Sequence, residues 1–312
     1  SHSGEFCLPG VVFLRAMRRV VRASAALALP GIALFMQGNR LDAAGVMIPK
    51  GKTSGEDAFI EEAALRVWAV FDGVGGWSDV GVDPALFSRN LALQTCAACR
   101  RIDAGRSVGL SAPELRRALV DGLSRVSDPG SSTACLMSIA PSGELACANV
   151  GDSGFRLLRP QPNDRVGVVC RSKDMTHYFN CPHQLSAKGT GGDRAESGEL
   201  YSFVVRPGDT VVLATDGCFD NLWEADLCQV VDEHRGSPAA TMAHAIAERA
   251  RVASLRTTGD SPFASCGRKH GYVFRGGKPD DITVICIRVL AHPGASDAGV
   301  SGANGEKARS RL

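Results

Sequence analysis

Residues 65–76 read LRVWAVFDGVGG, a mainly apolar run that ends at Asp72-Gly73. An apolar, β-branched run that stops at Asp-Gly is typical of a buried strand followed by a tight turn. Strand interiors disfavour aspartate, and yet an aspartate adjoins an apolar, strand-like run three more times in the chain. An aspartate follows or precedes an apolar strand-like run at Asp152, Asp216 and Asp280. The sequence therefore predicts several buried strands, each with a carboxylate at one end.

The remaining pattern predicts an α+β fold. Further strands are expected at residues 132–140, 143–150, 154–159, 210–214 and 281–289. Apolar residues at helical spacing predict helices at residues 84–101, 113–126, 224–234 and 238–254, with Asp83 and Ser111 as N-caps of the first two. Strands before and after pairs of helices indicate a central antiparallel β-sandwich flanked by pairs of α-helices.

The bulk composition excludes some classes of protein. A net charge of +2 is too close to neutral for a nucleic-acid binder. A hydrophobic fraction of 44% is enough for a sizeable core. The chain has 11 cysteines, and most lie in apolar runs, which favours a reducing, intracellular compartment over a disulfide framework.

The two ends differ from the body. Residues 1–39 form a basic segment, since residues 6–41 lack acidic residues and carry several arginines. This is typical of a mitochondrial or other organellar transit segment, although a packed amphipathic helix, in a cytoplasmic protein, is the alternative. The arginines interrupt the apolar stretch before it could span a membrane. We expect one domain over residues 40–290, with a flap at residues 171–200, and a disordered tail at residues 291–312.

The strand-end carboxylates predict a metal site. If the strands share sheets, their ends converge, and converging carboxylates must be neutralised by protons or by metal ions. Oxygen ligands favour Mg²⁺ or Mn²⁺, and no histidine lies near these aspartates in sequence. The acidic pair Glu56-Asp57 adds two carboxylates, and the carbonyl of Gly73 could approach an ion closely.

These motifs resemble those of the type 2C, metal-dependent (PPM) protein phosphatases. Six of them follow in the family's order: GEDA at 55–58, VFDGVGG at 70–76, GSSTA at 130–134, NVGDS at 149–153, LATDG at 213–217 and KPDDITV at 278–284. HYFN at 177–180 and RGGKPDD at 275–281 are similar to the family's organellar branch, known from mitochondria and plastids. The resemblance implies a four-layer αββα fold.

The resemblance also implies a reaction and roles for matching residues. Two Mn²⁺ or Mg²⁺ ions would be bridged by Asp72, with the Gly73 carbonyl on the second ion. Asp216 and Asp280 would complete the first. A hydroxide that bridges the ions would attack phosphorus directly, without a phosphoenzyme, and release phosphate from phosphoserine or phosphothreonine in protein substrates. We expect a monomer with no stable membrane span and no nucleic-acid partner.

Three further carboxylates have implied roles. Glu56 would hold the second ion through water, with Asp57 orienting waters beside it. Asp152, together with Asp216, would form a weaker third metal site.

Two positions depart from the family pattern. Val74 stands where many members have histidine, so another group must supply the proton to the leaving oxygen. Counting back four residues from Glu56 gives Lys52 in place of the family's phosphate-binding arginine. A lysine can neutralise phosphate as a point charge, without a bidentate contact. His177, in the predicted flap, is a candidate for contact with the substrate.

Two other functions compete with this interpretation. A pseudophosphatase would keep the fold as a binding module with weak or no turnover, but the metal carboxylates are all present. A metal-dependent hydrolase of small molecules would need a deep, closed pocket, whereas a shallow, open cleft would favour protein substrates.

Overall fold

The computed structural model describes residues 39–51 and 54–291. The predicted basic segment and tail lie almost wholly outside these ranges, as does Lys52, so these remain predictions. None of the helices in the described ranges is long and apolar enough to cross a membrane. The same ranges contain ten cysteines, all of them free.

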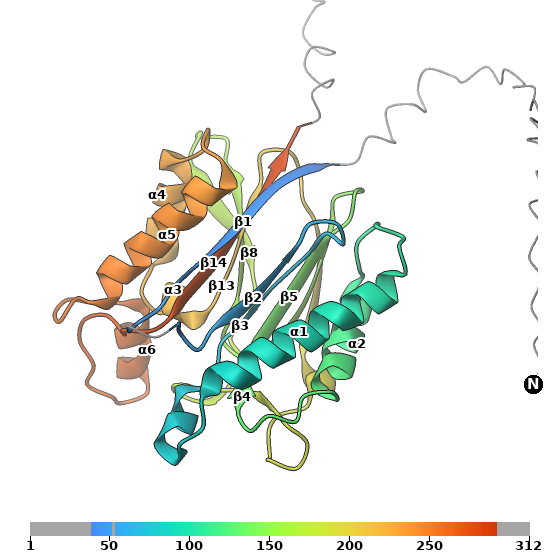
Figure 1. Cartoon of the computed structure of the whole chain (residues 1–312). Coiled ribbons are helices and arrows are strands. Elements are labelled where there is room, and N and C mark those ends of the chain that lie inside the picture. The colour runs from blue at the N-terminus through green and yellow to red at the C-terminus, as the bar shows by residue number, and fades with distance from the viewer. Residues whose placement is uncertain (1–38, 52–53, 292–312) are drawn as a thin grey trace, which may run out of the picture. The chain divides into compact units, whose positions relative to one another are not determined.

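Two five-stranded antiparallel sheets form the centre of the fold (Figure 1). The first has the strand order β12-β6-β5-β3-β2 and consists of β2 (Ala58–Glu62), β3 (Val67–Phe71), β5 (Ala134–Ile139), β6 (Glu144–Val150) and β12 (Glu199–Val204). The second has the order β1-β14-β13-β7-β8 and consists of β1 (Arg40–Ile48), β7 (Gly154–Pro160), β8 (Val166–Arg171), β13 (Thr210–Ala214) and β14 (Ile282–Leu290). The predicted antiparallel sandwich is confirmed.

Pairs of helices cover the outer faces of the two sheets, as Figure 1 shows. The helices α1 (Pro84–Asp103) and α2 (Ala112–Leu123) pack on the first sheet, and α4 (Glu224–Glu233) and α5 (Ala239–Ser254) on the second. The side chain of Asp83 accepts a hydrogen bond from the Ala85 amide, as expected of an N-cap. All four predicted helices are confirmed within a few residues.

The inner strands are buried on both faces, which explains their continuous apolar runs. In β3, Trp68 and Val70 pack with Phe155 and Ile285 in the layer between the sheets, whereas Phe71 packs in the layer under α1 and α2. This alternation follows from the two-residue period of a strand. The layers are therefore helix, sheet, sheet and helix.

Sequence analysis missed β1, β2, β8 and β12, which are the edge strands of the two sheets. Most of their side chains are only partly buried, so their sequences lack the unbroken apolar run of an inner strand. The helix α6 (Pro262–Lys269) was also missed; it is only eight residues long.

The remaining elements are short and lie near the strand ends. They are η2 (Gly75–Val80), β4 (Ser131–Ser132), β9 (Thr176–Tyr178), β10 (Cys181–Pro182), β11 (Leu185–Ser186), η3 (Ala195–Ser197) and α3 (Asp216–Phe219). The predicted flap contains β9 paired with β10, and its β11 pairs with β4. Because β4 lies beside the turn that begins at Asp72, this pairing attaches the flap to the edge of the candidate site.

Candidate metal centre

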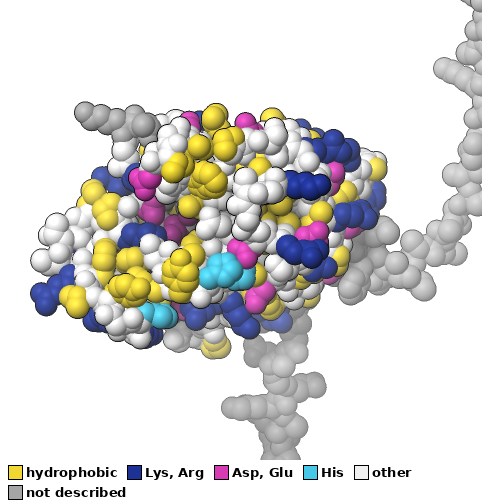
Figure 2. All heavy atoms as spheres, turned by 90° about the horizontal axis from the view of Figure 1, so that it is seen from below, with side chains coloured by type: hydrophobic (Ala, Val, Ile, Leu, Met, Phe, Trp, Pro, Cys, Tyr) yellow, Lys and Arg dark blue, Asp and Glu magenta, His cyan; other side chains and the backbone are white. Residues whose placement is uncertain are grey.

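Carboxylates from both sheets meet at one end of the sandwich. Asp72 follows β3, Asp152 lies between β6 and β7, and Asp216 follows β13. Each offers a carboxylate oxygen, and the three oxygens lie within 4.8 Å of one another. Asp280, just before β14, and Glu56 line the same cleft of about 310 Å³ as Asp72 and Asp216. Figure 2 shows acidic side chains recessed in a hollow on this face.

Thr133 fixes the turn that carries Asp72. Its amide donates to the Asp72 carbonyl at 3.0 Å, and its hydroxyl accepts from the Asp72 amide at 3.3 Å. The same hydroxyl is 2.8 Å from the hydroxyl of Ser153, the residue after Asp152. The small polar residues of the GSSTA stretch thus tie two of the carboxylate-bearing turns together.

Gly73 allows the turn to approach the loop that carries Glu56. A Cβ atom at Gly73 would lie 2.5 Å from the carbonyl oxygen of Glu56, so no larger residue fits without a shift. The hydroxyl of Ser88, in α1, donates to that same carbonyl at 2.5 Å. Backbone contact, rather than side-chain packing alone, sets the position of Glu56.

Asp281 braces the same loop from β14, and sequence analysis did not single it out. Its side chain accepts hydrogen bonds from the Lys50 amide at 2.7 Å and from the Glu56 amide at 2.5 Å. It is 3% exposed. The carboxylate of Asp281 is therefore occupied in holding Lys50 and Glu56 at the cleft.

Asp57 is buried behind the cleft. One of its oxygens accepts from the hydroxyls of Thr215 at 3.0 Å and Thr283 at 2.6 Å. Thr283 lies in β14 of the other sheet, and Thr215 directly follows β13 of that sheet. Burial raises the pKa of Asp57 well above its usual range. Asp57 thus links the two sheets beneath the site, and its predicted role in orienting waters stays a prediction.

The arrangement fits hard divalent cations. Among the described residues, one carboxylate oxygen each of Asp57, Asp152 and Asp216 is buried without a hydrogen-bond partner. Leaving such an atom unpartnered is costly, and a cation would satisfy it. Burial, together with the charge of Asp216, raises the pKa of Asp72 and that of Asp152. Carboxylate oxygens are the ligands that Mg²⁺ and Mn²⁺ prefer. A bound cation would also offset the repulsion between these carboxylates.

Known proteins share this sequence and this fold. The protein phosphatase PTC7 homolog of Xenopus laevis is 38% identical over 261 residues, which cover 78% of this chain and 84% of the relative. The probable protein phosphatase 2C 80 of Arabidopsis thaliana is 36% identical over 247 residues, covering 78% of this chain and 56% of that protein. A scan against models of protein families finds none that matches.

The chain belongs to the type 2C (PPM) family of metal-dependent protein phosphatases.

Solved structures of phosphatases have the same fold as this family member. The photosystem II phosphatase PBCP aligns with a TM-score of 0.71 and 30% identity, covering 81% of this chain and 100% of that one. The catalytic domain of the serine/threonine phosphatase PstP aligns with a TM-score of 0.54 over 80% of this chain and 99% of its own. At 19% identity, the second likeness shows the fold alone.

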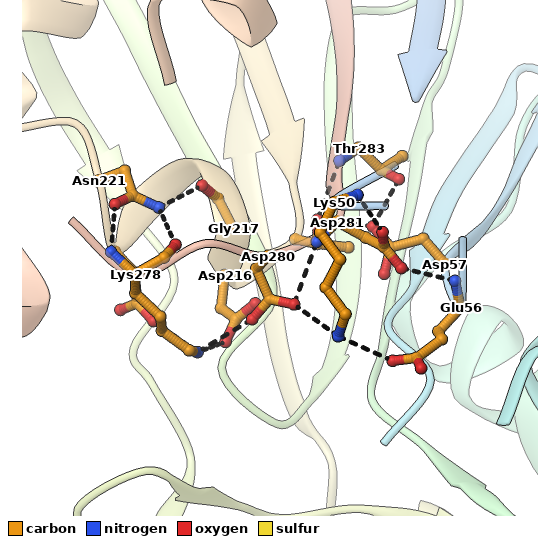
Figure 3. A network of polar contacts seen from close by, with 12 residues as sticks. Lys50, Glu56, Asp57, Asp216, Gly217, Asn221, Lys278, Asp280, Asp281 and Thr283 are labelled. Carbon is orange, nitrogen blue, oxygen red and sulfur yellow. Dashed lines mark hydrogen bonds and ion pairs between the residues drawn. The ribbon is translucent and has the colours of Figure 1, made fainter. Parts of the chain in front are cut away.

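Two lysines reach the carboxylates of this phosphatase-family site, and neither was predicted. The Lys50 ammonium lies 3.1 Å from Glu56 and 3.5 Å from Asp280. The Lys278 ammonium lies 2.5 Å from Asp216 and 3.3 Å from Asp280. Figure 3 shows the two side chains approaching Asp280 from different directions. Lys278 was quoted within a motif without a role, and Lys50 lies two residues from the predicted Lys52.

His177 lies in the flap, and its ring contacts two other residues of the flap. Its Nε2 atom is 3.0 Å from a carboxylate oxygen of Asp193, and its ring stacks on that of His183 with 4.1 Å between centroids. The flap residues that line the cleft are Asn180 and Pro182. A contact between His177 and substrate therefore stays a prediction.

Gly217→Ala is expected to destabilise the protein by about 1–3 kcal/mol or more, because of overpacking. An added Cβ atom would lie 1.9 Å from the backbone oxygen of Asp281, which cannot move without shifting the loop that carries Asp280. Urea unfolding of both proteins measures the change. Gly236→Ala is the matched control, since an added Cβ atom there meets nothing within 4 Å. Equal unfolding midpoints for the two variants would contradict this close approach.

Proposed function

We propose that this chain is an active protein phosphatase that hydrolyses phosphoserine and phosphothreonine with two Mn²⁺ or Mg²⁺ ions. The observation that carries the proposal is the convergence of Asp72, Asp152 and Asp216 at one end of the two sheets. Asp152 and Asp216 each have a buried oxygen without a hydrogen-bond partner among the described residues. The catalytic domain of PstP has been solved in complex with 2 manganese ions, which supports the choice of ion.

In this proposal Asp72 and the Gly73 carbonyl would help to hold the two ions. Asp216 and Asp280 would supply further carboxylate ligands. When bound, the ions would activate the attacking water and neutralise charge on the phosphoryl group, so that no phosphoenzyme is needed. Thr133 holds Asp72 in place through the backbone, and Asp57 fixes the strands beneath. The side chain of Val74 cannot donate a proton, so we propose that water protonates the leaving oxygen.

Lys50 takes the role assigned to Lys52 in this proposal. Its side chain is 41% exposed, and its ammonium pairs with Glu56 and Asp280. Burial lowers the pKa of Lys50, but Asp280 and Glu56 outweigh this and raise it, so the group stays charged. Cations bound to Glu56 and Asp280 would compete for those carboxylates and leave the ammonium to contact a substrate phosphate.

The accessibility of the cleft supports a protein substrate. The side chains of Glu56 and Asp280 are each 21% exposed, and that of Lys50 twice as much. A phosphorylated side chain on a protein surface could reach such groups, whereas a small-molecule hydrolase would be expected to enclose its ligand. The hollow on this face in Figure 2 is open to solvent.

Activity on a phosphothreonine peptide tests the proposed function. The purified chain should release phosphate with Mn²⁺ or Mg²⁺ and should lose this activity in EDTA and in the variant Asp216→Asn. A folded protein with no activity across divalent ions and several phosphopeptides would favour the pseudophosphatase, a binding module without turnover. Activity on small phosphate esters but on no phosphopeptide would favour the small-molecule hydrolase.

Replacing Lys50 with alanine is expected to lower kcat/KM on a phosphopeptide by about 10- to 100-fold, the loss of one charge-assisted phosphate contact. The effect should appear mainly in KM, and Lys50→Arg should recover much of the activity. Lys188→Ala, which removes an exposed flap lysine, is the matched control. If Lys50→Ala and Lys188→Ala behave alike, Lys50 does not bind the phosphate.

We further propose an organellar location, in mitochondria or plastids, and a monomeric state. The location rests on the arginine-rich, acid-poor start of the chain, which lies outside the described residues. A cytoplasmic location is the alternative, and fluorescence microscopy of the full chain with a C-terminal tag distinguishes them.

A further inference from the structure

Lys278 places a fixed cation inside the carboxylate cluster. Its ammonium lies 2.5 Å from Asp216, 2.9 Å from Asp220 and 3.3 Å from Asp280. An ammonium has three N–H donors, so three carboxylate partners match its capacity. The side chain is 17% exposed. Figure 3 shows this side chain extending toward Asp216 and Asp280.

The backbone of Lys278 is held as firmly as its ammonium. The side chain of Asn221 accepts from the Lys278 amide at 2.9 Å and donates to the Lys278 carbonyl at 2.9 Å. The same Asn221 amide group donates to the carbonyl of Gly217, next to Asp216, at 2.9 Å. Phe263 closes the other side, with its ring centroid 5.1 Å from the ammonium. Asn221 therefore contacts both Lys278 and Gly217, and so it positions Lys278 relative to the turn that carries Asp216.

The two oxygens of Asp216 have different surroundings. Its Oδ2 atom accepts from Lys278, whereas its Oδ1 atom is buried without a partner among the described residues. The residue is 8% exposed, so water does not easily compensate the unpartnered oxygen. Asp216 can thus keep Lys278 on one oxygen and offer the other to an ion shared with Asp72. Asp152 also has a buried Oδ1 atom without a partner in residues 39–51 and 54–291.

We propose that Lys278 is a permanent cation of this site, which takes the place of a further divalent ion on Asp216, Asp220 and Asp280. The site then holds two divalent ions rather than three, and the weaker third site expected at Asp152 and Asp216 does not fill. This inference rests on the proposed two-ion site. A tethered ammonium neutralises the carboxylates at any concentration of metal, and it is a point charge that three carboxylates can share.

Counting bound Mn²⁺ in the full chain tests the proposal. The wild type, Lys278→Met and Lys278→Arg would be stripped with EDTA, dialysed against increasing Mn²⁺, and analysed for bound metal by elemental analysis. We expect two ions in the wild type, two in Lys278→Arg, which keeps the charge, and three in Lys278→Met. The thermal unfolding temperature of Lys278→Met should depend more strongly on the Mn²⁺ concentration than that of the wild type.

The other outcomes each support or overturn the proposal. A third ion in the wild type, or only two in a folded Lys278→Met, would show that the lysine does not replace an ion. If Lys278→Met folds only when Mn²⁺ is present, an ion has taken the lysine's place, as proposed. If it fails to fold even with Mn²⁺, the lysine has a structural role that no ion can fill. A wild type that binds no Mn²⁺ would instead overturn the proposed function, and this inference with it.

Discussion

Replacing Asp72 with asparagine is expected to lower kcat about 10³-fold or more while making the metal-free protein more stable. Asp72 is the proposed bridge between the ions, and removing one preorganised charge-stabilising contact commonly costs 10²- to 10³-fold in rate. One oxygen of its carboxylate lies within 4.8 Å of carboxylate oxygens of Asp216 and Asp152. Asparagine keeps the shape and the backbone contacts to Thr133, but it removes one of the repelling charges.

The gain in stability should be on the order of 1–3 kcal/mol, since replacing buried charged groups by uncharged residues of similar volume is often stabilising by about 1–4 kcal/mol in other proteins. Urea unfolding in EDTA and steady-state kinetics in Mn²⁺ measure the two effects. Asp79→Asn, an exposed position in η2, is the matched control and should change neither. Loss of activity with an equal loss of stability would indicate that Asp72 has a structural role instead.

In EDTA, the free energy of unfolding should fall as the pH rises from about 4 to 7. Burial, with Asp216 and Asp280 nearby, raises the pKa of Asp220 to about 7, although Lys278 opposes the shift. Burial also raises the pKa of three other acids of the site: Asp72, Asp152 and Asp280. The unfolded chain releases these protons near pH 4, whereas the folded chain holds them to higher pH.

The sign and the size of this effect follow from proton linkage. Above pH 4 the folded state binds more protons than the unfolded state, so stability decreases with pH by up to about 1.4 kcal/mol per pH unit for each proton. The titration of Asp216 affects stability only below pH 4. Burial raises the pKa of Asp216, but Lys278 outweighs burial and leaves this pKa lowered. Mn²⁺ binds the deprotonated carboxylates, so its stabilisation should grow over the same range.

Thermal unfolding at pH 5, 6, 7 and 8, in EDTA and in Mn²⁺, measures this difference. At a free Mn²⁺ concentration 100 times its Kd, binding contributes about 2.7 kcal/mol per site. The gap between the two series should widen as the pH rises. Parallel curves in EDTA and Mn²⁺ would contradict a metal site built from these carboxylates.

The positions of the proposed metal-binding carboxylates could be predicted from sequence because each depends on a local pattern. An aspartate that adjoins a buried strand at its end must lie where the strands of the sheet end, and Asp72, Asp152 and Asp216 do so. The inner strands and the four long helices could be predicted for the same reason, since their apolar periodicity is written into ten or twenty consecutive residues. The edge strands could not, because a half-exposed strand carries a weaker pattern.

The sequence by itself determined the family, the order of the inner elements and the carboxylates that meet at the site. Only the tertiary structure decided which cations accompany them and which carboxylates are already occupied. Lys50 and Asp280 are 230 positions apart, and Lys278 and Asp216 are 62 apart, yet the ammonium of each lysine contacts its aspartate. A long lysine side chain can reach in many directions, so its partners depend on how distant loops pack. Spacing along the chain places a backbone turn, but it does not fix where an ammonium several bonds away will lie.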